Sequence, residues 1–76
     1  MTGRKFDYKE LKTRIFNKFG TQKSFAKYLG ITPNALTRKL NNKNYFTQEE
    51  IAKTLDILAV ESYFETISLF FKEIVE

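Results

Sequence analysis

Four polar side chains in the middle of the chain have the types and the spacing to recognise nucleic-acid bases. They are Asn34, Thr37, Arg38 and Asn41. Spacings of three and four residues place side chains on one face of a helix. Asparagine can pair with adenine, arginine can pair with guanine, and threonine can contact a base edge or a thymine methyl group. The pattern predicts a helix face that contacts bases in a major groove, and contact with phosphate alone is the alternative role for Arg38.

Two further polar residues, Gln22 and Lys23, lie at the expected start of the preceding helix. The backbone N–H groups at a helix N-terminus point outward and favour an anion. A phosphate of a nucleic-acid backbone is therefore the predicted partner of this segment, and an ordinary solvent-exposed helix start is the alternative.

The residue types that catalysis and metal binding most often use are missing. The sequence has no histidine and no cysteine, which removes the commonest general base, the commonest metal ligand and any disulfide. Glu49 and Glu50 are paired carboxylates, which can act as an acid and a base. They fall in the first turn of an expected helix, however, where the helix dipole favours acidic residues. We therefore expect no enzymatic activity, no metal and no cofactor.

Two short helices joined by a tight turn must position the polar residues. The first is expected over residues 22–29 and the second over residues 33–41. Gly30 follows the first helix, where glycine adopts a left-handed backbone at little cost. Ala26 is small enough to let the second helix cross close to the first, and Pro33 suits a first helical turn. This arrangement predicts a helix-turn-helix, with Thr21 and Thr32 as N-caps.

The residues Ala26, Gly30 and Leu36, with Gln22 before them and Asn41 after them, resemble the Cro/lambda-repressor-type (XRE-type) helix-turn-helix family. The resemblance covers residues 11–58 and is nearest to small phage Cro-like regulators. It implies an all-α, five-helix, lambda-repressor-like bundle that binds double-stranded operator DNA. The DNA-backbone contacts expected on this basis are Thr21, Gln22, Lys23, Asn42, Lys43 and Asn44.

Three positions depart from the family pattern. Lys39 stands where an apolar residue is common, and Asn42 replaces the glycine that often ends the second helix. Asparagine is the next best residue for a left-handed cap. Pro33 falls at an expected base-contacting position, and its side chain cannot form a hydrogen bond.

Helices are also expected on both sides of the motif. Asp7 and Glu10 have capping-box spacing, and an apolar stripe follows them: Tyr8, Leu11, Ile15, Phe16 and Phe19. Thr47 and Glu50 predict a second capping box and a helix with Ile51, Leu55 and Leu58 facing inward. Glu49, Glu50 and Asp56 are expected on its outer side, and Phe46 is expected to anchor the loop before it.

A fifth helix is expected over residues 63–75, after a cap at Ser62. Its apolar residues exceed what one buried face needs, and the main stripe is predicted to be Tyr63, Ile67, Phe70 and Ile74. The helix either packs deeply across its neighbours or binds another chain. The second possibility predicts a homodimer through residues 63–75. An extended strand over residues 67–71 is the alternative for this apolar run.

Charge is distributed unevenly along the chain. Residues 1–46 hold eleven Lys or Arg and two acids, a net charge of +9, and residues 47–76 hold two Lys and seven acids, a net charge of −5. The basic part contains the helix-turn-helix, as expected of a protein that meets phosphates. Residues 1–6 form a short basic arm that is expected to be mobile.

The length of 76 residues predicts a single domain over residues 1–76. We expect a soluble cytoplasmic chain, since the sequence shows no signal peptide and no apolar run long enough to span a membrane. The leading functional hypothesis is a sequence-specific transcriptional regulator that binds operator DNA. The alternative is an antirepressor that keeps the fold but binds a repressor protein, for which the aromatic residues near Tyr45 and in the last helix are the support.

Overall fold

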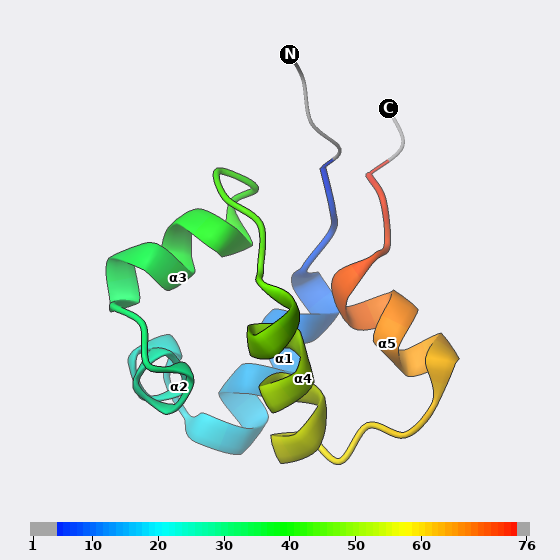
Figure 1. The fold of residues 1–76 in the computed structure, drawn as a ribbon, viewed down its shortest axis with the longest axis horizontal. Coiled ribbons are helices and arrows are strands. Elements are labelled where there is room, and N and C mark those ends of the chain that lie inside the picture. Colours follow the sequence, from blue (N-terminus) through cyan, green and yellow to red (C-terminus); the bar gives the residue numbers. More distant parts are fainter. Residues whose placement is uncertain (1–4, 75–76) are drawn as a thin grey trace.

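The computed structural model describes residues 5–74, which form five α-helices (Figure 1). They are α1 (Lys9–Phe19), α2 (Gln22–Leu29), α3 (Pro33–Leu40), α4 (Gln48–Ile57) and α5 (Tyr63–Phe70). Within residues 5–74 the backbone forms no β-strand beyond one isolated bridge. The predicted all-α fold of five helices is therefore confirmed. None of the helices in this part of the chain has the length and apolar character needed to cross a bilayer.

Helix α1 lies at the centre of the bundle and packs against both α2 and α5, while α2 packs against α3 and α4. Leu11 and Ile15 of α1 are fully buried, as their spacing predicted. Phe16 was expected in the same stripe, but its side chain is 67% exposed. One residue further along a helix is a turn of about 100°, and this turn carries Phe16 away from the face that Leu11 and Ile15 bury.

The chain before α1 is extended and pairs with the C-terminal segment. Asp7 N–H donates to Lys72 O at 2.7 Å, and Ile74 N–H donates to Lys5 O at 2.9 Å. The two ends of the described chain accordingly run side by side in Figure 1. Lys5 and Phe6 of the predicted mobile arm are thus held in backbone pairing, and residues 1–4 of that arm lie outside the described residues.

This pairing also moves the start of α1. The predicted cap at Asp7 is wrong, because the N-cap is Tyr8 and its side chain makes no cap hydrogen bond. Asp7 Oδ1 instead accepts from Lys9 N–H at 2.9 Å. The backbone N–H of Asp7 is hydrogen-bonded to Lys72 O, so the helix begins later than the sequence pattern indicated.

Helix α5 is shorter than predicted, because it ends at Phe70 rather than near residue 75. The strand alternative is wrong for residues 67–70, which are helical. Residues 72–74 leave the helix to pair with the start of the chain. The helix buries Leu69 and Phe70, so the predicted stripe that included Tyr63 and Ile67 is not the buried face.

A closed circuit of aromatic rings joins the two chain ends to the loop before α4. Phe70 meets Phe46 edge to face, with ring centroids 5.3 Å apart, and Phe46 meets Tyr8 at 5.4 Å. Phe6 and Phe71 complete the circuit, at 6.3 Å from Tyr8 and 6.4 Å from Phe70 respectively and 6.1 Å from each other. Phe46 therefore anchors its loop as predicted, and aromatic packing together with the buried Leu69 holds α5 to the bundle.

Candidate functional site

The turn between α2 and α3 has the geometry that the sequence predicted. Thr21 Oγ1 accepts from Ser24 N–H at 3.2 Å, and Thr32 Oγ1 accepts from Ala35 N–H at 3.0 Å. Gly30 is left-handed, with φ of 78°, and a β-carbon there would be strained by this backbone conformation. Phe25, Ala26 and Leu29 of α2, and Leu36 and Leu40 of α3, are buried. Both caps and the turn are confirmed, and together they fix the direction of α3.

The face of α3 that is directed away from the core carries the predicted base contacts. Asn34, Thr37, Arg38 and Asn41 are all exposed. Thr37 Oγ1 donates to Pro33 O at 3.0 Å, so its proton is already used and its oxygen is left to accept a hydrogen bond. The structure thus brings amides, a hydroxyl and a guanidinium together on one helix, a composition that can contact base edges or a polar protein surface.

Five of the six predicted backbone contacts flank this face as exposed residues. They are Thr21, Gln22 and Lys23 at the start of α2, and Lys43 and Asn44 after α3. The sixth, Asn42, is half-buried, and both ends of its amide are occupied. Its Oδ1 accepts from Phe6 N–H at 2.8 Å, and its Nδ2 donates to Phe6 O at 2.9 Å. Asn42 also has the left-handed backbone that its sequence position predicted, with φ of 62°.

The role of Asn42 is therefore to tie the chain start to the end of α3. We expect Asn42→Ala to lower the free energy of unfolding by about 1–3 kcal/mol. The substitution removes two hydrogen bonds, and it places alanine, which tolerates a positive φ less well than asparagine, at this position. Asn42→Gly keeps the backbone freedom and loses only the hydrogen bonds, so its loss should be smaller. Urea unfolding of the two variants measures the difference, and equal losses would mean that backbone strain contributes nothing.

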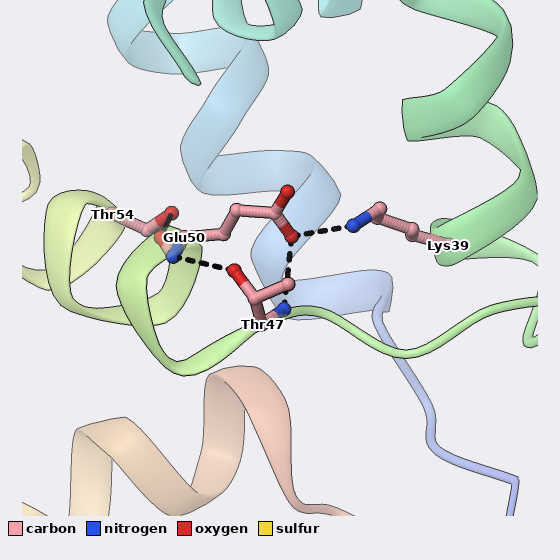
Figure 2. A network of polar contacts seen from close by, with 4 residues as sticks. All are labelled: Lys39, Thr47, Glu50 and Thr54. Carbon is pink, nitrogen blue, oxygen red and sulfur yellow. Dashed lines mark hydrogen bonds and ion pairs between the residues drawn. The ribbon is translucent and has the colours of Figure 1, made fainter. Parts of the chain in front are cut away.

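A buried ion pair joins α3 to α4. Lys39 Nζ lies 2.6 Å from Glu50 Oε1, and the two side chains are only 11% and 12% exposed. The same Oε1 accepts from Thr47 N–H at 2.9 Å, and Glu50 N–H donates to Thr47 Oγ1 at 3.1 Å (Figure 2). The predicted capping box is confirmed, but the prediction that Glu50 lies outside is wrong. Its carboxylate turns back to close the box and meets the Lys39 side chain from α3.

The pair explains why lysine replaces an apolar residue at position 39. The ammonium group meets the carboxylate, and it also lies 5.9 Å from the centre of the Phe46 ring. Burial by itself would raise the pKa of Glu50, but the hydrogen bonds from Lys39 and Thr47 and the charge of Lys39 outweigh it and hold that pKa below its ordinary value of 4.5. Lys39 is thus committed to positioning α3 and is not one of the free cations of the exposed face.

A hollow of about 470 Å³ lies where α2 and α3 meet. Ile31 and Pro33 supply apolar surface, and Lys23, Ser24 and Lys27 supply the polar remainder. Pro33 was expected to contribute no hydrogen bond to base recognition, and here it lines an apolar recess instead. Within the described residues no group of acidic side chains is arranged to hold a metal ion.

A second exposed surface lies on α5, the helix whose surplus of apolar residues led to the predicted homodimer. Tyr63 and Phe64 are 88% and 84% exposed, and Ile67 and Phe71 are also exposed. Their spacing places them along one side of the helix, and we call these four residues the α5 face. The surplus of apolar residues was visible in the sequence, but which of them reach the core was not.

Two comparisons with known proteins find a match. The chain matches the family DUF739, described as a protein of unknown function, over residues 4–73. Among solved structures it is similar to the modulator of repression (MOR) of the temperate bacteriophage TP901-1 from Lactococcus lactis, with 32% identity and a TM-score of 0.71. That alignment covers 87% of this chain and 88% of the other. No curated protein sequence matches the chain. These comparisons do not show the Cro/lambda-repressor family, so that resemblance rests on the sequence motif alone.

Proposed function

The chain belongs to the DUF739 family, and we propose that it is a regulator of transcription that acts by binding a repressor protein. The observation that carries the proposal is the similarity, in fold and over nearly the whole length of both chains, to a phage modulator of repression. Such a protein needs no catalytic group, metal or cofactor, in keeping with a sequence that has no histidine and no cysteine.

The proposed mechanism is a shift in the occupancy of the operator. A protein that binds the free repressor more tightly than the operator-bound repressor lowers operator occupancy by mass action. A protein that prefers the bound form raises it for the same reason. The size of the effect depends on the difference between the two affinities, since equal binding to both forms shifts nothing.

Binding to operator DNA is the second candidate function. Its support is the exposed face of α3, on which Asn34 and Arg38 offer hydrogen bonds suited to adenine and guanine. Lys23 and Lys43 lie exposed on either side of this face and suit phosphate contacts. Neutralising about five phosphates would give a slope near −4 to −5 in log affinity against log salt concentration.

One experiment separates the two candidates. Binding to the repressor encoded nearest to this gene, and to its operator DNA, is measured side by side for the unmodified protein and for a variant with Lys23→Ala, Arg38→Ala and Lys43→Ala. We expect the unmodified protein to bind the repressor and to cause no mobility shift of operator DNA alone.

The opposite pattern contradicts the proposal. If the unmodified protein ignores the repressor but shifts the operator with the expected salt dependence, and the triple variant loses that shift, then the α3 face is a DNA-binding surface. Circular dichroism of the triple variant serves as the control for folding, because the three side chains are exposed and their removal should leave helicity unchanged.

A further inference from the structure

We infer that the α5 face is a docking surface for a basic protein surface with an apolar centre. Tyr63, Phe64, Ile67 and Phe71 form this face. The inference rests on the proposed function in one respect, which is that the repressor is the partner expected to present such a surface.

The first argument is the exposure of large apolar side chains on a short helix. Helix α5 has eight residues and already contributes Leu69 and Phe70 to the core. Tyr63 and Phe64 lie in its first turn, where they extend into solvent instead of packing on the bundle. Contiguous exposed apolar surface of this kind marks an interaction site, and aromatic side chains supply a large share of the binding energy at protein interfaces.

The second argument is the charge around the face. Residues 59–71 contain two acids, Glu61 and Glu65, and no lysine or arginine. Both carboxylates are exposed. Lys72 is the first cation after this segment, and Arg14 and Lys18 line a separate hollow with Ile57 and Ala59. A partner with lysine and arginine around an apolar centre complements this pattern.

The same charges disfavour a membrane surface and a second copy of the chain as occupants of the α5 face. Helices that lie on anionic membranes carry lysine or arginine beside their apolar face, whereas α5 carries no lysine or arginine and has Glu65 in its first turn. In a symmetric homodimer the face would meet itself, which would bring Glu61 and Glu65 of one copy towards the same carboxylates of the other. The predicted homodimer through residues 63–75 would therefore have to overcome repulsion between like charges.

The chemistry of the proposed partner follows from how repressors bind DNA. A surface that contacts several phosphates is rich in lysine and arginine, so the DNA-contacting surface of a repressor fits the α5 face and the carboxylates of Glu61 and Glu65 beside it. Docking there would compete directly with the operator. Helices α3 and α5 lie at opposite sides of the bundle, with α1 and α4 between them (Figure 1), so occupation of the α5 face leaves the α3 face accessible.

The test compares two exposed aromatic sites. The affinity for the repressor encoded nearest to this gene is measured by calorimetry for the unmodified protein, for Tyr63→Ser with Phe64→Ser, and for the control Phe16→Ser. Phe16 is also an exposed aromatic residue, but it lies on α1. We expect the double variant to bind at least about 30-fold more weakly, as loss of interface hot spots does, and Phe16→Ser to bind like the unmodified protein. Helicity and the midpoint of thermal unfolding should be unchanged in all three.

A second set of variants tests the charge argument. Glu61→Gln with Glu65→Gln should slow association and weaken its dependence on salt, because charges at the rim of an interface mainly steer the encounter. Glu10→Gln is the matched control, since Glu10 is an exposed acid in the first turn of α1.

Each outcome bears on a different claim. If the unmodified protein binds the repressor and Tyr63→Ser with Phe64→Ser binds equally well, the inference is overturned while the proposed function stands. If the unmodified protein does not bind the repressor, both fail. Sedimentation that shows a dimer abolished by the same double variant would assign the face to a second copy, and flotation with anionic vesicles abolished by it would assign the face to a membrane. Either result would also overturn the inference.

Discussion

Replacing Phe70 with alanine is expected to lower the free energy of unfolding by about 3–5 kcal/mol, which is the usual cost of truncating a buried phenylalanine. The Phe70 side chain is almost fully buried and packs against both Phe46 and Phe71. Domains of this size are stable by roughly 5–15 kcal/mol. The variant should therefore lose a substantial part of its stability, and urea unfolding followed by circular dichroism would show the loss.

Phe64→Ala is the matched control for this prediction. It removes the same side chain from the same helix at a position that is 84% exposed. Its effect on stability should stay within about 0.5 kcal/mol, as for most surface substitutions. If the two variants lose equal stability, the aromatic circuit does not hold α5 to the bundle.

The second large effect is expected at the ion pair between α3 and α4. Lys39→Met should cost about 3 kcal/mol, because it leaves the buried Glu50 carboxylate without its charged partner. The double variant Lys39→Met with Glu50→Gln should cost less than the sum of the two single changes, since both remove the same interaction. Lys27→Met, at an exposed position on α2, is the control and should change stability little. If the stability losses of Lys39→Met and Glu50→Gln simply add in the double variant, the two side chains are not directly coupled.

The pH dependence of stability gives an independent measurement of the same pair. The pKa of Glu50 is lower in the folded chain than its ordinary value of 4.5. A lowered folded pKa contributes stability that is fully present above the unfolded pKa and is lost as the pH falls through the folded value. Stability should therefore decline below about pH 4.5 in the unmodified protein. Lys39→Met removes two of the four interactions that lower the pKa of Glu50, so that pKa should rise. The penalty of the variant should therefore shrink over the same pH range.

Local sequence signals were sufficient for the helix-turn-helix. Thr21 and Thr32 cap the helices, and Gly30 adopts the left-handed turn between them, as predicted. Each of these features depends on residues within four positions of one another, where backbone preferences and short hydrogen bonds decide the structure. The exposed polar face of α3 followed from the same helical spacing.

Predictions that needed long-range contacts were less accurate. Asp7 resembled a helix cap, but its backbone pairs with Lys72. The apolar residues after Phe70 resembled a continuing helix, but that segment leaves α5 to pair with the chain start. Both errors have one cause, which is that the two chain ends meet across more than sixty positions of sequence. No local pattern reports such a pairing.

The sequence by itself determined the all-α class, the positions of the turn and caps, and the separation of a basic first part from an acidic second part. Only the tertiary structure decided that Lys39 and Glu50 meet in a buried pair, that Asn42 is committed to Phe6, and that Tyr63 and Phe64 remain in solvent. The reason is that a side chain's helical position fixes its direction relative to its own helix alone. Whether that direction meets water or another element depends on how the helices pack, and packing joins residues that are distant in the chain.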